Sequence, residues 1–472
     1  MEHLDNYRGR QVVILGLARS GVAVAKLFHE AGALVTVNDK KERHLCPEAD
    51  ELSALGISVV CGSHPSGLVH EGVALVVKNP GIPYTIDPIQ KAEQLGIEVI
   101  TEVEVAYHIC KAPLICITGS NGKTTTTTWT GLMLEAAGLK PIVAGNIGRA
   151  LTEAALEAEA DNHLVVELSS FQLKGTNAFR PQIACLTNVY ETHLDYHQTM
   201  EDYVNSKLKL FANQTEEDTA VLNWDNPVCR RVMSEVRSQV LPFSTTTELE
   251  YGLFVQPPLG AKDDGVERTL VYRDRQGEVH TVVKSDELGI PGSFNIENAL
   301  AASALAITVG VPIETIAEVL KSFRGVEHRL EYVGSKDDVA FYNNSKATNP
   351  TATIKTIEAM KQNIILIAGG LDRGSDYMEL LPVFQRQVHG LVTLGETKEK
   401  IEHVARLAGL SQVKTVDTAT NVQDTVTAAV RAAFEMAKPG DVVLLSPACA
   451  SWDMFPSYEE RGRMFKQSVH NL

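Results

Sequence analysis

The chain has 472 residues, of which 44% are hydrophobic and 22% are charged, the balance of a soluble globular protein with several cores. At about 150 residues per domain this length predicts about three domains, and the composition excludes fibrous and disordered proteins. No apolar run approaches the ~18 residues that a membrane-spanning helix needs, and the opening MEHLD is not that of a signal peptide. We therefore expect a cytoplasmic protein that does not bind a membrane.

Charge and cysteine content exclude two further classes. The formal net charge of −16 argues against a nucleic-acid-binding protein. The seven cysteines are dispersed, with no CxxC pair, which indicates reduced thiols and not a disulfide framework or a zinc site. In so acidic a chain, a local cluster of lysines, arginines and helix N-termini is a candidate site for an anionic substrate.

The first domain opens with a β-α-β unit. Residues 11–16 (QVVILG) form a continuous apolar run, a helical stretch covers 21–31, and a second strand covers 33–39. Continuous apolar strands are typical of a parallel sheet that is covered on both faces. A further strand and Pro-Gly turn follow at 74–83, and we place the end of this Rossmann-like domain near residue 105.

The turn after the first strand, GLARSG (residues 16–21), follows the pattern GxAxxG. It resembles a dinucleotide-binding turn in which Ala18 replaces the middle glycine, and Asp39 ends the second strand, where a ribose-binding acid lies. Alone, the pattern predicts NAD or a non-redox nucleotide, and a plain tight turn is the ordinary alternative.

The strongest local pattern is TGSNGKTT (residues 118–125), between a strand and a helix. Glycines let backbone N–H groups surround a phosphate, Lys123 can neutralise the β- and γ-phosphates, and the Thr124 hydroxyl can reach Mg²⁺. The spacing GxxGKT is shorter than that of the usual phosphate loop, and a glycine-rich turn with a solvated lysine is the alternative. The pattern predicts a central P-loop ATPase-type α/β domain over 106–325 that binds ATP.

Three further residues of this domain are candidate metal or phosphate contacts. Glu167 ends a predicted strand, where a Mg²⁺ ligand belongs, although such a residue can also cap the next helix. His193 follows a strand and could ligate a metal, contact a phosphate or lie on the surface. Lys207 lies on a predicted helix and by itself reads as a solvated cation.

Two shorter patterns follow in the chain. Residues 240–290 lose the helical pattern, which predicts a small antiparallel addition to the central sheet with a hairpin turn at Asp274–Gly277. Near the second domain boundary, His328 and Arg329 are adjacent and suit a phosphate contact, with a structural ion pair as the ordinary alternative.

The last segment contains four predicted strands separated by helices, which indicates a third, Rossmann-like α/β domain over 326–472. Lys346, Arg373 and the pair Ser446 and Ser451 follow three of these strands. Because the carboxyl ends of parallel strands meet at one edge of a sheet, we expect these side chains to converge there. Such an edge suits a small anion, for example a dicarboxylate.

Across essentially its whole length the chain resembles the Mur ligases of peptidoglycan synthesis. The motif TGSNGKTT is shared with the related folylpolyglutamate synthetases, so alone it indicates only the superfamily. The motifs most similar to the D-glutamate-adding Mur ligases are GNIG (145–148), VELSSFQL (166–173), TNVYETHLDYH (187–197), NNSKATNP (343–350) and LSPACASWDMF (445–455). The three-domain division agrees with that of this family.

The resemblance implies an ATP-dependent amide-bond ligase that adds D-glutamate to UDP-N-acetylmuramoyl-L-alanine in cytoplasmic peptidoglycan precursor synthesis. ATP would phosphorylate the L-alanine carboxylate, and the D-glutamate amine would attack the acyl phosphate through a tetrahedral intermediate. The three domains would bind, in chain order, the UDP-sugar, ATP and the amino acid. The resemblance also implies a monomer with two Mg²⁺ ions, one held by Thr124 and Glu167 and one by His193 and a carbamylated Lys207.

Site residues follow from the resemblance position by position. The implied catalytic residues are Lys123, Glu167, His193 and Lys207. The implied ATP contacts are Gly119, Ser120, Asn121, Gly122, Lys123, Thr124, Thr125, Asn295, His328, Arg329 and Asn344. The implied substrate contacts are Ser20, Asp39 and Lys40 for the uridine diphosphate, Asn146 near the reaction centre, and Lys346, Thr348, Arg373, Ser451 and Tyr458 around D-glutamate.

Three positions depart from the family pattern. Phe294 precedes Asn295 where members usually carry His, Asn344 stands where many carry Asp, and Arg373 stands where others carry Lys. Arginine keeps the charge and can clamp a carboxylate with two hydrogen bonds.

Three other readings compete with this one. A folylpolyglutamate synthetase would not explain the first-domain turn or the SSFQL run. An NAD-dependent oxidoreductase built on residues 12–39 leaves the phosphate loop and the third segment unexplained. A non-catalytic nucleotide-binding protein is disfavoured because Lys123, Glu167, His193 and Lys207 are all present.

Overall fold

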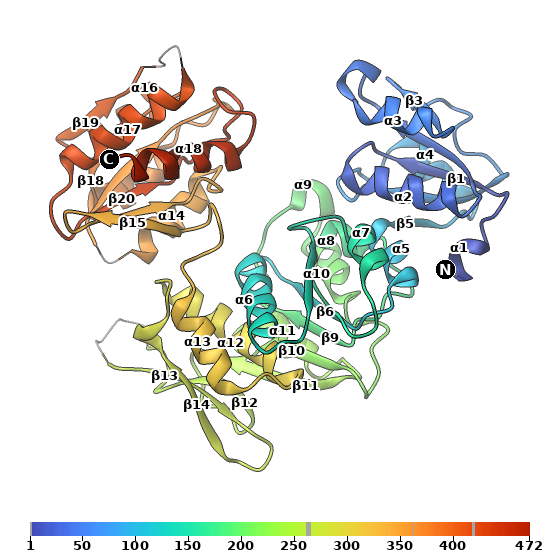
Figure 1. The fold of residues 1–472 in the computed structure, drawn as a ribbon, viewed down its shortest axis with the longest axis horizontal. Helices are drawn as coiled ribbons and strands as arrows, with labels where there is room; N and C mark the ends of the chain where they lie inside the picture. Colours follow the sequence, from blue (N-terminus) through green and yellow to red (C-terminus); the bar gives the residue numbers. More distant parts are fainter. Residues whose placement is uncertain (1, 261–265, 361, 418–420) are drawn as a thin grey trace. The chain divides into compact units, whose positions relative to one another are not determined.

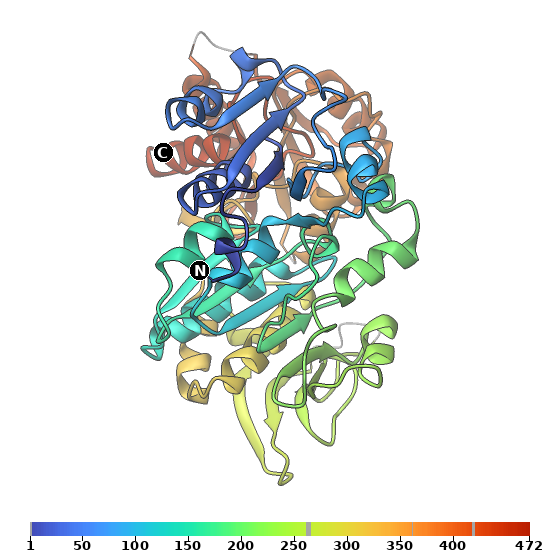
Figure 2. The same ribbon diagram turned by 90° about the vertical axis from the view of Figure 1, so that its right-hand side faces the viewer.

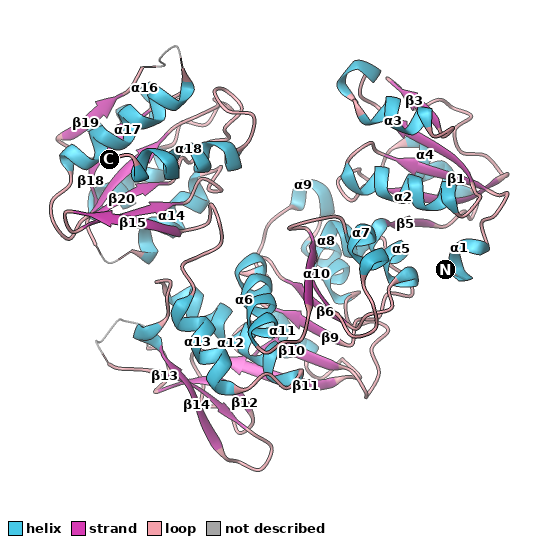
Figure 3. Cartoon of the chain, in the orientation of Figure 1, coloured by secondary structure: helices cyan, strands magenta, loops and turns pink. Residues whose placement is uncertain are grey.

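The computed structural model describes residues 2–260, 266–360, 362–417 and 421–472. The chain divides into two compact units, one holding the residues up to Glu287 together with Ile296–Lys321, the other Leu288–Asn295 with Ser322–Leu472. The described residues form three β-sheets flanked by helices, two in the first unit and one in the second (Figures 1 and 3). The α/β architecture predicted from the alternation of strands and helices is confirmed. No helix in the described ranges is long and apolar enough to cross a membrane.

The N-terminal sheet is wholly parallel, with the strand order β3-β2-β1-β4-β5. Its strands are β1 (Gln11–Leu15), β2 (Leu34–Asp39), β3 (Ser58–Cys61), β4 (Val73–Lys78) and β5 (Val99–Thr101). Its helices are α1 (Glu2–Asp5), α2 (Arg19–Glu30), α3 (Glu48–Ala54), α4 (Asp87–Gln94) and α5 (Glu102–Ile109), with a 3-10 turn at Arg43–Leu45. The predicted β-α-β unit is β1-α2-β2, and helix α2 begins two residues before the predicted start at residue 21.

The central sheet has the order β14-β13-β12-β11-β10-β9-β6-β8-β7. Its strands are β6 (Leu114–Thr118), β7 (Pro141–Gly145), β8 (His163–Glu167), β9 (Ile183–Leu186), β10 (Thr219–Asn223), β11 (Gln239–Ser244), β12 (Gly252–Gln256), β13 (Thr269–Arg273) and β14 (Val279–Lys284). Strand β6 lies between β8 and β9, all parallel, so the phosphate-loop motif and Glu167 end neighbouring strands.

The antiparallel addition predicted over 240–290 is smaller than expected. Strands β10, β11 and β12 still run parallel, and only the β12–β13 and β13–β14 pairs are antiparallel. The hairpin turn at Asp274–Gly277 is confirmed, with the Gly277 N–H donating to the Asp274 carbonyl at 3.1 Å. This hairpin extends beyond the rest of its sheet in both views (Figures 1 and 2).

Helices cover the central sheet (Figure 3). The helices of this domain are α6 (Lys123–Ala136), α7 (Leu151–Glu157), α8 (Ser170–Lys174), α9 (Leu194–His197), α10 (Met200–Leu208), α11 (Pro227–Val232), α12 (Ser293–Thr308) and α13 (Ile313–Ser322), with a 3-10 turn at Ser285–Glu287. Helix α8 begins with a capping box, in which the Ser169 hydroxyl and the Gln172 side chain each accept the other's backbone N–H. The motif SSFQL is therefore a helix start placed directly after Glu167.

The C-terminal sheet has the order β15-β16-β20-β17-β18-β19. Its strands are β15 (Glu331–Lys336), β16 (Val339–Asn343), β17 (Ile364–Ala368), β18 (Val388–Thr393), β19 (Gln412–Thr415) and β20 (Val442–Leu445). Its helices are α14 (Pro350–Ala359), α15 (Leu381–Gln387), α16 (Lys398–Leu407), α17 (Val422–Met436) and α18 (Tyr458–His470), with a 3-10 turn at Met378–Leu380. The four predicted strands are present, and the sequence analysis missed the two edge strands, β15 and β19, because their residues lack a continuous apolar run.

Two buried carboxylates join the N-terminal sheet to the central one through α5. Glu102 accepts the Thr152 N–H at 2.9 Å and its hydroxyl. Glu104 accepts the N–H groups of Asn177, Ala178 and Phe179 at 2.9, 2.7 and 3.2 Å. Although burial opposes it, hydrogen bonds from His108 and these N–H groups hold the pKa of Glu104 below its usual value.

We expect Glu104→Ala to lower the free energy of unfolding by about 2–4 kcal/mol, because three backbone N–H groups lose their acceptor. Urea denaturation at pH 7 measures this loss, and Glu104→Gln, which keeps one acceptor oxygen, is the milder control. Since the folded pKa lies below the unfolded value of 4.5, the stabilisation is complete above pH 4.5 and is lost as the pH falls through the folded pKa. An unchanged midpoint for Glu104→Ala would contradict this role.

Candidate functional site

Two glycines shape the turn between β6 and α6. Gly119 and Gly122 have φ of 153° and 83°, which disfavour side chains. A Cβ on Gly119 would lie 2.0 Å from the Thr187 hydroxyl oxygen, and one on Gly122 would lie 2.1 Å from the amide oxygen of Asn298. Both glycines are therefore needed for the loop to pack against its neighbours.

Asn188 braces the loop from the neighbouring strand end. Its carbonyl accepts the Ser120 N–H at 2.8 Å, and its side-chain oxygen accepts the Asn121 N–H at 2.9 Å. The first bond within α6 runs from the Thr126 N–H to the Gly122 carbonyl. The N–H groups of residues 123–125 therefore precede Thr126, the first donor of a bond within the helix, which makes this end a site for an anion.

Two ammonium groups converge on one carbonyl of the loop. Lys123 Nζ donates to the Gly119 oxygen at 2.9 Å and to the Ser120 oxygen at 3.1 Å. Lys207 Nζ donates to the same Gly119 oxygen at 2.8 Å, from helix α10. Lys207 is only 2% exposed, so its interpretation from the residue pattern alone as a solvated cation is wrong. Burial and then the charge of Lys123 hold the pKa of Lys207 well below its usual value.

Glu167 offers a buried anionic oxygen to this site. It is 1% exposed, and one carboxylate oxygen accepts a hydrogen bond from the Asn146 amide at 2.8 Å. The other oxygen, Oε2, is buried with no hydrogen-bond partner among the described residues. A buried carboxylate is costly without a partner, so this oxygen suits a cation. Thr124, also buried, lies in the first turn of the neighbouring helix α6.

Tyr203 links the remaining predicted residue, His193, to the loop. Its hydroxyl lies 2.8 Å from the Ser120 hydroxyl, and its ring lies under Lys207 Nζ at 4.7 Å. His193 is exposed, has a φ of 58°, and packs its ring against Tyr203 at 6.2 Å and Phe171 at 5.1 Å. The structure thus brings His193, Lys207 and the phosphate loop together around one tyrosine.

In the described ranges, one group of three acidic or histidine side chains is close enough together to hold a metal, and it does not lie at the phosphate loop. It comprises Asp274, Glu278 and His280 at the β13–β14 hairpin. One Asp274 oxygen already accepts the N–H groups of Gln276 and Glu278, both at 2.9 Å, so this carboxylate stabilises the turn.

A pocket of about 530 Å³ opens beside Glu167, with walls from the N-terminal and central sheets of the first unit. It is lined by Ala18, Ser20, Asn79, Pro80, Gly81, Glu102, Gly145, Asn146, Gly148, Arg149, Ala150, Ser169, Phe171 and Gln172. Two predicted substrate contacts, Ser20 and Asn146, are in this wall. Asp39 and Lys40 are not, and the Asp39 carboxylate accepts the N–H groups of Leu17 and Lys41, which stabilises the first-domain turn.

Most residues of the pocket wall were not predicted individually, although the motifs that contain them were. Phe171 and Gln172 belong to the SSFQL run that comes shortly after Glu167, and Asn79 to Gly81 are the Pro-Gly turn after a predicted strand. The signal was present in both cases, because polar or aromatic residues at the carboxyl ends of parallel strands line the ligand edge of a sheet.

In the second unit the predicted convergence of strand ends is confirmed. Strands β16, β20 and β17 are parallel neighbours, so the loops that carry Lys346, Ser451 and Arg373 leave the same edge. The Asn344 amide donates to the Ser446 hydroxyl at 3.1 Å, and the Leu371 N–H donates to the Ala450 carbonyl at 3.0 Å.

The side chains at this edge differ in exposure. Arg373 is exposed and lies over the Trp452 ring at 5.2 Å, whereas Ser451 is buried. Lys346 Nζ lies 5.7 Å from the centre of the Tyr458 ring, and Thr348 is half-buried. A planar cation, an ammonium group and hydroxyls at one sheet edge suit a small dicarboxylate.

Four predicted ATP contacts also belong to this unit. His328 is buried beside the Asn343 amide at 3.0 Å, and burial lowers its pKa. The Asn344 oxygen accepts the Leu330 N–H, and its NH₂ donates to Thr356, which an aspartate could not do. Asn295 is buried in the first turn of α12, and Arg329 is half-buried.

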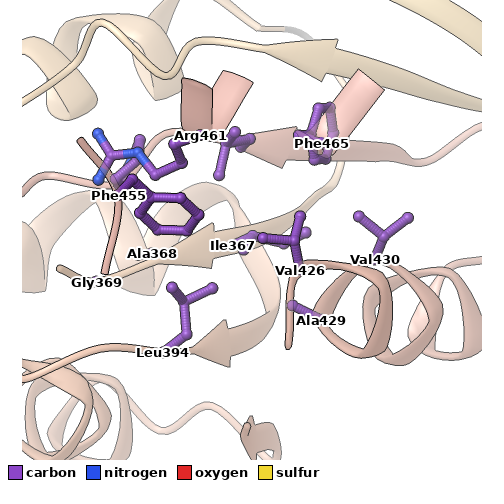
Figure 4. A pocket seen from close by; sticks show the side chains of 12 residues that line it. Ile367, Ala368, Gly369, Leu394, Val426, Ala429, Val430, Phe455, Arg461 and Phe465 are labelled. Carbon is purple, nitrogen blue, oxygen red and sulfur yellow. The ribbon is translucent and has the colours of Figure 1, made fainter. Parts of the chain in front are cut away.

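An apolar crevice beside the same sheet edge is almost completely filled by its own side chains. It has room for about 10 Å³, near the lower limit for one water, between residues of β17, α17 and α18 (Figure 4). Arg461, which borders it, is 2% exposed and donates to the Ser345 and Cys449 carbonyls at 2.9 and 3.2 Å. This guanidinium ties the loop after β16 to the loop after β20.

Comparison with known proteins agrees with this architecture. Residues 10–101 match the model of the Mur ligase MurD-like N-terminal domain, 117–306 the Mur ligase middle domain, and 328–449 the Mur ligase glutamate ligase domain. Among solved structures, the UDP-N-acetylmuramate–alanine ligase of Thermotoga maritima matches with a TM-score of 0.58 and 18% identity, over 98% of this chain and 99% of that one. A MurF from Acinetobacter baumannii matches with a TM-score of 0.56 and 17% identity, over 88% and 87%. These two likenesses concern the fold.

Curated relatives are more similar in sequence. The UDP-N-acetylmuramoylalanine–D-glutamate ligase of Geobacillus kaustophilus is 48% identical over 99% of this chain and 98% of its own length. The ligases of the same name from Enterococcus hirae and Bacillus subtilis are 45% and 44% identical over 100% of this chain, and over 98% and 100% of their own lengths. The chain therefore belongs to the Mur ligase family, and these full-length relatives are D-glutamate ligases of that family.

Proposed function

We propose that this protein is an ATP-dependent amide-bond ligase that adds D-glutamate to UDP-N-acetylmuramoyl-L-alanine in cytoplasmic peptidoglycan precursor synthesis, acting as a monomer. The observation that carries the proposal is the phosphate loop, with two lysine ammonium groups on the Gly119 carbonyl, next to a pocket of about 530 Å³. Relatives of that activity, similar over the full length, support the choice of substrates.

Each domain would bind one substrate, and the third domain would also contribute contacts to ATP. Residues 1–105 would bind the UDP-sugar, 106–325 would bind ATP, and 326–472 would bind the amino acid. The pocket wall with Ser20 and Asn146 supports the first assignment. Asp39 and Lys40 would contact the uridine diphosphate, as the resemblance implies. The cations at the C-terminal sheet edge support the last, with Lys346 and Arg373 on the carboxylates of D-glutamate.

The remaining residues would contact the amino acid and ATP. At the amino-acid site Thr348 and Ser451 would donate hydroxyl hydrogen bonds, and Tyr458 would pack against the ligand. At the ATP site the contacts would be Gly119, Ser120, Asn121, Gly122, Lys123, Thr124, Thr125, Asn295, His328, Arg329 and Asn344.

The chemistry requires charge to be neutralised while a phosphoryl group moves. An oxygen of the alanine carboxylate bonds to the γ-phosphorus of ATP, and the bond from that phosphorus to the bridging oxygen breaks, releasing ADP. Lys123 and the N–H groups that begin α6 would hold the transferred phosphoryl group. The D-glutamate amine then attacks the acyl carbon, loses a proton, and expels phosphate from the tetrahedral intermediate, while Asn146 orients the acceptor.

The residues present fit Mg²⁺. The buried, unpartnered Oε2 of Glu167 and the Thr124 hydroxyl are oxygen ligands of the kind that Mg²⁺ prefers, and they would hold one ion. When bound, Mg²⁺ would neutralise charge on the phosphates. His193 and Lys207 would hold a second ion only if Lys207 were an anion, because an ammonium group repels a metal.

Carbamylation would supply that anion. A neutral lysine amine bonds to the carbon of CO₂ and loses a proton, which gives a carbamate with two oxygen ligands. Burial and the nearby charge of Lys123 favour the neutral amine of Lys207, since they lower its pKa. The resulting carbamate would also compensate the charge of Lys123.

Phosphate release from ATP with UDP-N-acetylmuramoyl-L-alanine tests the proposed function. We expect release with D-glutamate that matches the amide product formed, and little release with L-glutamate or with no amino acid. No release with any amino acid would contradict the proposal.

A pair of lysine variants tests whether this activity depends on the phosphate loop. Lys123→Ala should lower phosphate release at least about 10³-fold, because the phosphoryl charge loses its partner. Lys140→Ala removes an exposed lysine of the same domain, paired with Asp161 on the surface, and should leave the rate unchanged. Equal rates for the two variants would contradict the role of Lys123.

Variants of Lys207 test the carbamate. We expect Lys207→Ala to be at least about 100-fold slower than the unsubstituted protein and to regain activity with added acetate or propionate, which replace the lost anion. Lys207→Arg keeps a cation of similar length but cannot form the carbamate, so it should be inactive and gain nothing. Full activity of Lys207→Arg would contradict the modification.

A further inference from the structure

A second buried lysine lies behind the wall of the pocket, and the proposed chemistry does not use it. Lys78 ends strand β4 and is 1% exposed. Its Nζ donates to the Tyr196 hydroxyl and to the Pro80 carbonyl, both at 3.1 Å, and lies 4.5 Å from the centre of the Tyr84 ring. Among the side chains that the structure describes, no carboxylate forms an ion pair with it. Burial and then the charge of Lys174 lower the pKa of Lys78 to about 7.

Tyr196 joins this lysine to the central domain. It belongs to α9, the short helix that directly follows His193. Its hydroxyl accepts from Lys78 and lies 3.1 Å from the Pro80 carbonyl and 3.3 Å from the Ile82 carbonyl, to which it can donate. The Pro80 carbonyl is therefore held from both domains of the first unit.

The segment held in this way is part of the pocket. Asn79, Pro80 and Gly81 line the wall that the N-terminal domain contributes. Phe171, on the opposite wall, packs edge-on against Tyr196 at 4.5 Å and against His193 at 5.1 Å. A shift of Tyr196 would thus move both walls and the His193 ring.

Tyr196 is itself held by a polar chain. Lys174 lies 6.0 Å from its ring centre and pairs with Asp202 at 2.7 Å. The same Asp202 oxygen contacts His197 Nδ1 at 2.7 Å, and His197 Nε2 contacts the Ser170 hydroxyl at 2.9 Å. These contacts fix α9 against α8 and α10.

Burying a lysine without an acidic partner destabilises the folded state, because the ammonium group loses its hydration. A methionine of similar length would pack there without the desolvation cost of an ammonium group. The retained lysine is better explained by the two oxygens that it holds, one on each domain.

We propose that Lys78 and Tyr196 are positioning residues for the nucleotide sugar, which hold the Asn79–Gly81 wall of the pocket against the helix that follows His193. The inference rests on the proposed function for the identity of the ligand. It assigns neither residue a contact with the substrate.

Two tyrosines that face Lys78 provide a matched test. Tyr196→Phe removes the bonded hydroxyl, whereas Tyr84→Phe removes a buried hydroxyl that has no partner among the described residues. We expect Tyr196→Phe to raise the KM for UDP-N-acetylmuramoyl-L-alanine about tenfold, with kcat and the KM for ATP nearly unchanged. Tyr84→Phe should match the unsubstituted protein in all three.

Lys78→Met separates positioning from stability. We expect this variant to melt at or above the temperature of the unsubstituted protein, because a buried cation is gone, and yet to show the raised nucleotide-sugar KM. A lower melting temperature with kcat and every KM altered together would mean a purely structural lysine. Identical KM values for Tyr196→Phe and Tyr84→Phe would also overturn the inference.

Calorimetric binding of the nucleotide sugar distinguishes this inference from the proposed function. If the unsubstituted protein binds the ligand without turnover, the proposed function fails, and the ratio of Kd values for the two tyrosine variants still decides the inference. If it neither binds nor turns over the ligand, both are overturned.

Discussion

The site of the first unit depends on the two hydrogen bonds that the Gly119 carbonyl accepts, one from Lys123 Nζ and one from Lys207 Nζ. Like charges brought to one buried acceptor repel each other, so the arrangement is favourable only when anions compensate it. The first turn of α6 points further N–H groups to the same place. Phosphate, carboxylate and carbamate are the anions that would complete this site, and the proposed reaction uses all three.

Sheet topology explains why these groups meet. Strands β6, β8 and β9 are parallel neighbours, so their carboxyl ends deliver the phosphate loop, Glu167 and Asn188 to one edge. The pocket beside this edge is closed by residues of the N-terminal sheet, whose position is fixed by the buried carboxylates of α5. A stiff junction suits a large acceptor that must present one carboxylate to ATP.

Local sequence patterns were sufficient to place the residues of the phosphate loop and Glu167 at strand ends, because each placement depends on residues adjacent in the chain. The convergence in the second unit also needed the rule that parallel strands end at one edge of a sheet. Local patterns could not predict contacts between distant residues. The burial of Lys207 depends on the loop it reaches, 88 residues away, and the bond from Lys78 to Tyr196 spans 118 residues. Edge strands β15 and β19 were missed because a half-exposed strand needs no continuous apolar run.

The proposal that matters most for this site is that Lys207 is carbamylated, so that its negative charge compensates the charge of Lys123. The most direct measurement is the ¹³C NMR spectrum of the protein in ¹³C-bicarbonate, compared with that of Lys207→Arg under the same conditions. We expect one carbamate carbonyl resonance in the unsubstituted protein that is absent from the variant. No such resonance, or one that persists in Lys207→Arg, would contradict it.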